Sequence, residues 1–146
     1  MAAEKSALDQ HIHRNILIIS RDTDMSQVWK TIFEQRNCHV VCKSSGAEGV
    51  SSSRELSPTL ILLDLDMPDS ERLALCRELR STTDGALLLL DSNLKNPDVL
   101  EYHRAGVNET ISASISPMAL LVKSLAWLAR YDWVIPRRQS VRLLRT

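Results

Sequence analysis

Apolar residues along the chain fall into short unbroken runs that alternate with stretches of helical periodicity. In the most continuous run, Thr59 to Leu63 lead directly into Asp64, and Pro68 follows four residues later. A run of this length without a polar break is typical of a parallel strand covered on both faces. Because a charge inside such a strand is costly, we expect Asp64 to lie at its carboxyl end, where open α/β sheets carry their sites.

The remaining runs complete an alternating pattern of strands and helices. The predicted strands are 15–19, 38–42, 59–63, 86–90 and 107–111, and the predicted helices are 24–35, 46–54, 71–81, 96–105 and 116–130. Such alternation predicts a flavodoxin-like, doubly wound (βα)5 fold with a five-stranded parallel sheet in the order 2-1-3-4-5. Strands one and three are neighbours in that order, so the topological switch point lies between Ser20 and Asp64.

Helical spacing and capping residues predict the details of the helices. The residues expected to face inward are Val28, Trp29, Ile32 and Phe33 in the first helix and Leu73, Leu75, Cys76 and Leu79 in the third. Asp22 or Thr23 is expected to cap the first helix, and Asp69 or Ser70 the third. Gly106 is expected to end the fourth helix.

Length and composition limit the classes of function. The 146 residues suffice for one core, and we expect a lead-in at 1–13, one domain at 14–131 and a basic extension at 132–146. The net charge is zero, and the longest apolar runs are far below the roughly 20 residues of a membrane span. With no apolar signal segment at the N-terminus, these features predict a cytoplasmic protein that contacts no membrane.

No motif typical of an enzyme is present. The sequence holds only four glycines, and it contains neither a glycine-rich phosphate loop nor an HExxH motif nor a nucleophile elbow. The three cysteines fit no disulfide or zinc spacing, which favours reduced thiols. The four arginines in 137–145 favour a solvated tail, or a linker to an output domain, over nucleic-acid binding.

Several motifs together resemble the receiver domain of bacterial response regulators. They are the segment 62–68, the helical stretch 73–80, the segment 104–108, and Ser116-Pro117 with Leu120-Leu121. The resemblance covers about 14–131. It implies phosphorylation on the residue that matches Asp64, with Mg²⁺ held by that aspartate and two acidic residues at the end of strand one.

The positions that carry this chemistry in the family are altered here. The two acidic positions are Ser20 and Arg21, and Asp22 lies one residue further along. The family's hydroxyl after strand four is Asp91, its lysine after strand five is Ala113, its aromatic in strand five is Thr110, and a loop glycine is Arg72. The resemblance with these changes implies a degenerate pseudo-receiver with no cofactor and no Mg²⁺ site.

A charge cluster is one consequence of these substitutions. Two carboxylates about 4 Å apart, as Asp64 and Asp91 would be, repel by several kcal/mol at an intermediate dielectric. The guanidinium of Arg21 can bind two carboxylates, so we hypothesise an Arg21–Asp64–Asp91 cluster. The alternative is that these side chains are separately hydrated.

The last predicted helix has two apolar sides. The residues Met118, Leu121, Val122, Leu125 and Leu128 suit the core, and the residues Leu120, Trp127 and Tyr131 lie on another side. The second side predicts either a surface for a protein partner, most simply a homodimer, or a surface covered by Trp133, Val134 and Ile135 of the extension.

Three functions follow, in order of preference. The first is a phosphorylation-independent signalling and protein-interaction module. The second is a working receiver of a two-component phosphorelay, phosphorylated on Asp64. The third is a regulator linked to a small ligand or a nucleic acid.

Overall fold

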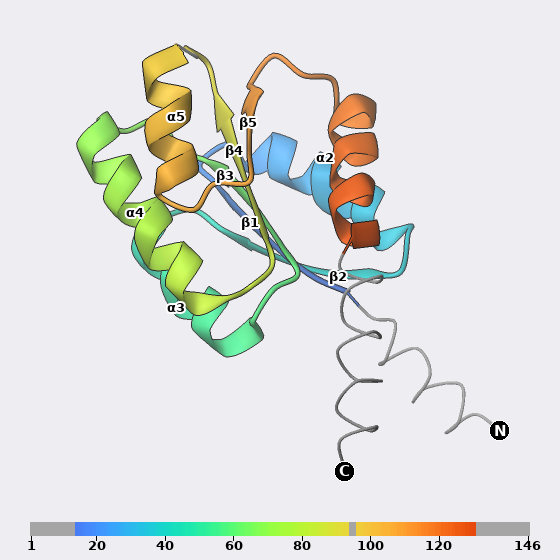
Figure 1. The fold of residues 1–146 in the computed structure, drawn as a ribbon. Helices are drawn as coiled ribbons and strands as arrows, with labels where there is room; N and C mark the ends of the chain where they lie inside the picture. Colours follow the sequence, from blue (N-terminus) through green and yellow to red (C-terminus); the bar gives the residue numbers. More distant parts are fainter. Residues whose placement is uncertain (1–13, 94–95, 131–146) are drawn as a thin grey trace, which may run out of the picture.

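A parallel sheet lies at the centre of the molecule (Figure 1). The computed structural model describes residues 14–93 and 96–130. Its strands are β1 (Arg14–Ser20), β2 (Cys38–Lys43), β3 (Leu60–Asp64), β4 (Ala86–Asp91) and β5 (Glu109–Ser112). They pair in the order β2-β1-β3-β4-β5, and every pairing is parallel, which confirms the predicted doubly wound sheet.

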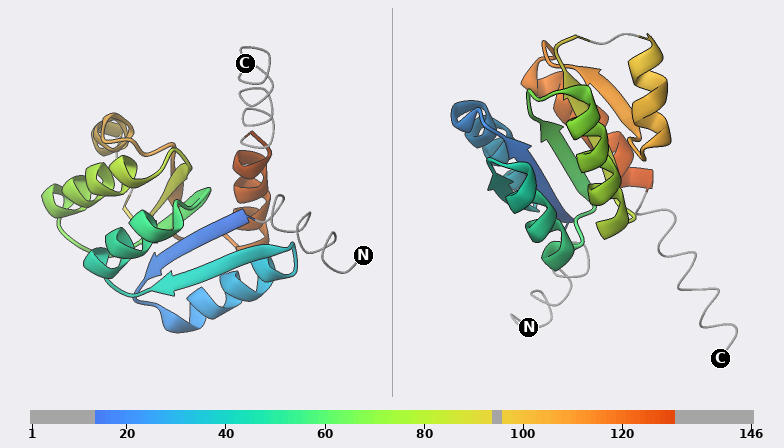
Figure 2. Two further views of the ribbon diagram at one scale, coloured as in Figure 1. Left: turned by 90° about the horizontal axis from the view of Figure 1, so that it is seen from below. Right: turned by 90° about the vertical axis from the view of Figure 1, so that its left-hand side faces the viewer.

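Helices cover both faces of the sheet. They are α2 (Thr23–Glu34), α3 (Gly46–Leu56), α4 (Asp69–Thr82), α5 (Asn96–Arg104) and a helix described over 117–130. Figures 1 and 2 show α2 and the 117–130 helix on one face, with α3, α4 and α5 on the other. This arrangement is expected when right-handed crossovers join parallel strands that run outward from a switch point.

Alternation along the central strands divides the core in two. On β3, Leu60 and Leu62 pack toward α2 and the 117–130 helix, whereas Ile61 and Leu63 pack toward α3, α4 and α5. On β4, even-numbered residues such as Leu88 face the first side and odd-numbered residues such as Leu89 face the second. Continued to the strand ends, this period of two places Asp64 on the α2 face and Asp91 on the α4–α5 face.

Two predictions about buried helix faces are wrong in part. In α2, Trp29 and Phe33 are buried as expected, but Val28 is 43% exposed because the buried stripe runs through Ser26 instead. In the 117–130 helix, Leu121 and Leu128 are buried as expected, but Leu120 is fully buried as well, and Met118 and Val122 are 59% and 64% exposed. The buried side of that helix includes the polar Ser124, so the apolar pattern indicated a stripe rotated from the true one.

Most element boundaries agree with the sequence patterns. Asp22 caps α2 by accepting a hydrogen bond from the Met25 amide at 3.0 Å, and Gly106 after α5 has a positive φ of 107°, as expected. The predicted cap of α4 is wrong, because Pro68 occupies that position and makes no side-chain cap. β5 starts at Glu109, two residues later than predicted.

Candidate functional site

Asp64 lies at the carboxyl end of β3, beside the end of β1. The register pairs Ser20 with Asp64, and the Ser20 hydroxyl donates to Asp64 Oδ2 at 3.0 Å. The same hydroxyl accepts the Asp22 amide at 3.1 Å. Ser20 is buried and Asp64 half-buried, so the carboxylate remains partly open to solvent at the predicted switch point.

The surroundings of Asp64 disfavour its charged form. Burial raises the pKa of the Asp64 carboxyl, the Ser20 hydrogen bond lowers it, and the negative charge of Asp22 raises it again, with a net upward result. A carboxyl whose pKa is raised in a partly open site is typical of functional positions. It is also less reactive as a nucleophile at a given pH when it is protonated.

Asp91 is bound by Arg72 on the opposite face of the sheet. Arg72 Nη2 lies 3.0 Å from Asp91 Oδ2, and both side chains are almost fully buried, at 8% and 6% exposure. Asp91 Oδ1 also accepts the Asn93 amide at 3.1 Å. Since Leu63 pairs with Leu89, Asp91 lies one residue beyond the position level with Asp64, and alternation directs it toward α4.

Tyr102 and Asp69 complete the surroundings of Arg72. Arg72 Nε donates to the Tyr102 hydroxyl at 2.8 Å, and that hydroxyl donates to Asp69 Oδ1 at 2.6 Å. Arg72 also donates to Asp69 and to the Leu65 carbonyl, at 3.1 and 3.4 Å. Burial opposes the charge of Arg72, but the hydrogen bond with Tyr102 and the nearby anionic groups leave its pKa above the usual value. We call Arg72, Asp91, Tyr102 and Asp69 the Arg72 cluster.

The proposed Arg21–Asp64–Asp91 cluster is therefore wrong. Arg21 is exposed, and the ion pair of Asp91 is made by Arg72 instead. The exposed guanidinium of Arg21 avoids the free-energy cost of desolvation that a buried position would carry. The aliphatic stem of Arg72, in contrast, already lies in the core.

The structure brings together only some of the predicted site residues. Ser20, Asp22 and Asp64 lie close together, and Asp22 serves as a helix cap. Asp91 belongs to the Arg72 cluster, and its carbonyl accepts the amide of the exposed Ala113 at 3.0 Å. Thr110 is half-buried on β5, where it lines a pocket beside α5.

Sequence reasoning missed the role of Arg72 and Tyr102. A signal for Arg72 was present, because Arg72, Cys76 and Leu79 recur at the spacing of one helix face. An arginine in an otherwise apolar stripe needs a buried partner. The odd-numbered position of Asp91 on β4 placed that partner on the same face.

The oxygen ligands at Asp64 do not fit a magnesium site. Within the described residues, no group of three His, Cys, Asp or Glu side chains is placed to hold a metal ion. The Asp22 carboxylate is engaged by the Met25 amide, and the Ser20 hydroxyl donates to Asp64. Mg²⁺ demands near-octahedral oxygen coordination, usually anchored by one or two carboxylates that are free to bind it. We assign no metal-dependent step to these residues.

The predicted interface residues have separate environments. Leu120 is part of the core, so it is unavailable to a partner. Trp127 is partly buried, its Nε1 donates to Glu109 Oε1 at 2.8 Å, and the Arg130 guanidinium lies 4.2 Å from its ring centroid. Tyr131 and the residues 133–135 that were considered as its cover lie outside the described residues.

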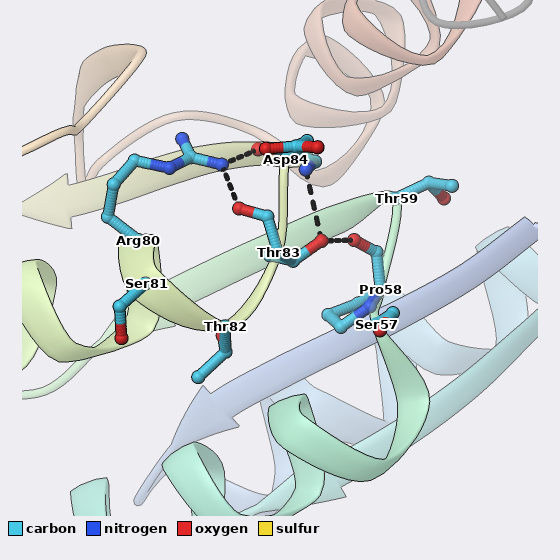
Figure 3. Close-up of a pocket in the computed structure, with 9 residues that line it drawn as sticks. Ser57, Pro58, Thr59, Arg80, Ser81, Thr82, Thr83 and Asp84 are labelled. Atoms are coloured by element: carbon cyan, nitrogen blue, oxygen red, sulfur yellow. Dashed lines mark hydrogen bonds between the residues drawn. The ribbon is translucent and has the colours of Figure 1, made fainter.

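Another pocket lies at the amino ends of the central strands, away from Asp64 (Figure 3). It has a volume of about 430 Å³ and is lined by the segments just before β3 and β4 and by the end of α4. Its polar groups bind one another: Arg80 donates to the Thr83, Gly85 and Gly106 carbonyls, and the Thr83 hydroxyl donates to the Pro58 carbonyl at 2.6 Å. These contacts make it a structural corner of the fold.

Two further sequence predictions concern the thiols and the membrane. Cys38, Cys42 and Cys76 are free of disulfides, as expected, and burial raises the pKa of Cys76 to about 12. Across residues 14–93 and 96–130, no helix combines the length and the apolar character needed to cross a bilayer.

Other proteins share this fold. A two-component response regulator from Clostridium difficile superposes with a TM-score of 0.74 at 21% identity, covering 82% of this chain and 98% of that one. A CheY-like receiver domain protein from Methanospirillum hungatei also gives 0.74, at 22% identity, covering 82% and 96%. At these identities the structures establish the fold alone.

Sequence comparison establishes the family. Residues 16–124 match the response regulator receiver domain, so the chain belongs to that family of two-component signalling modules. The DNA-binding response regulator MtrA of Mycolicibacterium paratuberculosis is 24% identical over 121 residues, which cover 83% of this chain and 54% of MtrA. The chain thus spans about half the length of the curated relatives it matches.

Proposed function

We propose that this chain is a degenerate receiver that signals in the cytoplasm through protein contacts, without phosphorylation of Asp64. One observation carries the proposal: Asp91 is held by the buried Arg72 on the face of the sheet opposite Asp64. The position from which the family supplies a hydroxyl to the phosphoryl group therefore carries a carboxylate that is already ion-paired.

The groups that neutralise a phosphoryl charge are also replaced. Ala113 stands where the family has a lysine, and Ser20 and Arg21 stand where it has two acidic metal ligands. Phosphoryl transfer depends on electrostatic stabilisation and positioning more than on covalent chemistry. Without the lysine and the metal ligands, Asp64 accepts a hydrogen bond from the neutral Ser20 hydroxyl and lies near the like charge of Asp22.

The second candidate is a working phosphoacceptor of a phosphorelay. It is supported by Asp64 itself, which keeps its place at the end of β3 and stays partly open to solvent. A small phosphodonor distinguishes the two candidates. The protein is incubated with acetyl phosphate, with and without Mg²⁺, and its intact mass is recorded. Tryptophan fluorescence is recorded in parallel with beryllofluoride, a non-covalent mimic of the phosphoryl group.

The two candidates predict different masses. A degenerate receiver keeps its unmodified mass under both conditions, as does its Asp64→Asn variant. An adduct that requires Mg²⁺ and disappears in Asp64→Asn overturns the proposal. A receiver domain that is known to accept a phosphoryl group from acetyl phosphate is treated in parallel, to show that the reagents are active.

The partner surface of this proposal is the outward side of the 117–130 helix. Met118 and Val122 lie one turn apart on that side and are 59% and 64% exposed, so they replace Leu120 as the interface candidates. We place a second copy of the chain there, and no nucleic acid. Light scattering tests this placement: a Val122→Glu variant is expected to lower the mass of a dimeric wild type, whereas Gln27→Glu, an exposed position on α2, is expected to leave it unchanged.

A further inference from the structure

The Arg72 cluster joins three elements that approach one another from different parts of the chain. Arg72 belongs to α4, Asp91 to the end of β4 and Tyr102 to α5. The helices meet the strand end on the α4–α5 face of the sheet (Figure 2). A single guanidinium on α4 therefore contacts both the end of β4 and α5.

All three nitrogens of the Arg72 guanidinium donate hydrogen bonds, and together they reach four different groups. Nε binds the Tyr102 hydroxyl, Nη1 binds the Leu65 carbonyl, and Nη2 binds both Asp69 and Asp91. The Cζ atom also lies 5.1 Å from the centroid of the Tyr102 ring. Since a guanidinium is rigid and planar, these contacts fix its position and orientation together.

Asp91 is held from its other side as well. Its Oδ1 accepts the Asn93 amide, and its backbone carbonyl accepts the Ala113 amide. The carboxylate therefore links Arg72 to the segment that leaves β4, and the Asp91 backbone links that segment to the turn after β5. Removing Arg72 leaves the Asp91 carboxylate buried without its counter-charge, and removing Asp91 leaves Arg72 with Asp69, a carboxylate that is 55% exposed, in place of a buried one. Both changes are destabilising for a pair of this kind.

We infer that Arg72 and Asp91 form an obligate buried pair that holds the end of β4 and the first residues after it in one fixed arrangement against α4 and α5. This inference does not depend on whether Asp64 is ever phosphorylated. The pair also fixes one wall of the neighbouring pocket of about 500 Å³, because α5 supplies both Tyr102 to the cluster and Val99, Leu100 and His103 to that pocket.

A double-mutant cycle tests the coupling. The variants are Arg72→Met, Asp91→Asn and the double variant, and Arg104→Met is the matched control because Arg104 makes only an exposed pair with Glu101. Each single variant in the cluster is expected to lower the urea midpoint markedly, and the double variant is expected to lower it by much less than the sum. Arg104→Met is expected to leave it unchanged.

Native-state hydrogen exchange tests the arrangement directly. The Asn93 amide donates to Asp91 Oδ1, whereas the Asn108 amide donates to the Leu87 carbonyl away from the cluster. In Arg72→Met, exchange at Asn93 is expected to rise at least tenfold more than at Asn108. Additive midpoint shifts, or equal changes at the two amides, would overturn the inference. If Arg72→Met does not fold, the conservative Arg72→Lys variant carries the same exchange measurement.

Discussion

Asp64 keeps a carboxyl group where burial raises its pKa. Because the folded pKa lies above the unfolded value, the favourable contribution of this group is complete below the unfolded pKa and is lost as the pH rises through the folded pKa. At neutral pH, where the unfolded carboxyl is ionised, the surroundings of Asp64 therefore lower the stability of the folded state. Functional positions commonly carry such a cost.

Asp64→Asn is accordingly expected to raise the free energy of unfolding at pH 7, by about 0.5–1 kcal/mol on the scale of such substitutions. The asparagine oxygen can still accept the Ser20 hydrogen bond. The gain is expected to shrink as the pH falls through the raised pKa of the folded state and to be gone below about 4, where the unfolded carboxyl is also protonated. Urea titrations at several pH values measure it, with Asp66→Asn as the exposed neighbouring control. A loss of stability at pH 7 would contradict this account.

Tyr102 offers a second test at the scale of one residue. Burial and the Asp69 hydrogen bond raise the pKa of its phenol to about 12, against the opposing effect of Arg72. In a Tyr131→Phe background, which leaves Tyr102 as the remaining tyrosine, absorbance at the phenolate band is expected to titrate well above the ordinary value near 10. The phenol's contribution to stability is then present below about 10 and lost between roughly 10 and 12.

Tyr102→Phe removes the hydroxyl that bridges Arg72 and Asp69 while keeping the ring. It is expected to cost about 1–3 kcal/mol, because a buried guanidinium donor loses its acceptor. Ser81→Ala, which removes an exposed hydroxyl bound to Glu78, provides the control in the same urea titration. A cost no larger than that of the control would show that the hydroxyl contributes little.

Arg72 marks the limit of sequence reasoning at the scale of residues. Asp64, Ser20 and Asp22 were placed correctly because the end of a strand and a helix cap are local features. The partner of Asp91 was not, because the assignment relied on a family position instead of on the alternation of β4. The side-chain period is two residues along β4 and between three and four residues along α4. Applied together, these periods would have placed Arg72 and Asp91 on the same side of the sheet.

At the scale of elements, the 117–130 helix shows why its face was mistaken. Two apolar stripes of similar quality run along it, and the buried one contains Ser124, a polar residue that weakens its signal. The structure decides through Leu120, which packs into the core with Leu121 and Leu128. Propensity and periodicity place the helix correctly from Ser116, whose hydroxyl accepts the Ala119 amide, but they do not fix its rotation.

The rotation of the 117–130 helix can be tested by comparing the stability of two variants. Leu120→Ala is expected to cost about 2–5 kcal/mol, as do other large-to-small changes in a packed core. Val122→Ala, on the outward side, is expected to change stability by less than about 0.5 kcal/mol. Thermal or urea unfolding of the two variants separates the alternatives. Comparable losses, or a larger loss for Val122→Ala, would place Val122 in the core, as the sequence pattern predicted.

At the scale of the whole molecule, the sheet order was predictable because strand and helix patterns alternate without exception across the described elements. The same order brings Ser20 beside Asp64 whatever the side chains are. Whether the site works depends instead on which charges converge there. Burial and topology constrain the core of the fold more strongly than they constrain the side chains at the strand ends.

If lost groups alone account for an unreactive Asp64, restoring them should restore reactivity. The rebuilt variant carries Ser20→Asp, Arg21→Asp, Asp91→Thr and Ala113→Lys, the residue types that the family resemblance implies at these positions. We expect it to form an Mg²⁺-dependent adduct with acetyl phosphate that raises its intact mass, where the wild type forms none. Adding Asp64→Asn to the rebuilt variant is expected to abolish the adduct.

The Arg72 cluster predicts a further condition on this experiment. Asp91→Thr removes the buried partner of Arg72, so the four-residue variant should be markedly less stable than the wild type. Adding Arg72→Gly, the residue type at this position in the family, removes the orphaned charge and should recover much of that loss, although glycine inside α4 itself costs about 1 kcal/mol. Urea midpoints of the two variants measure the recovery. If the four-residue variant is as stable as the wild type, Arg72 does not need Asp91 as its partner. The substitutions at positions 72 and 91 would then be independent of each other.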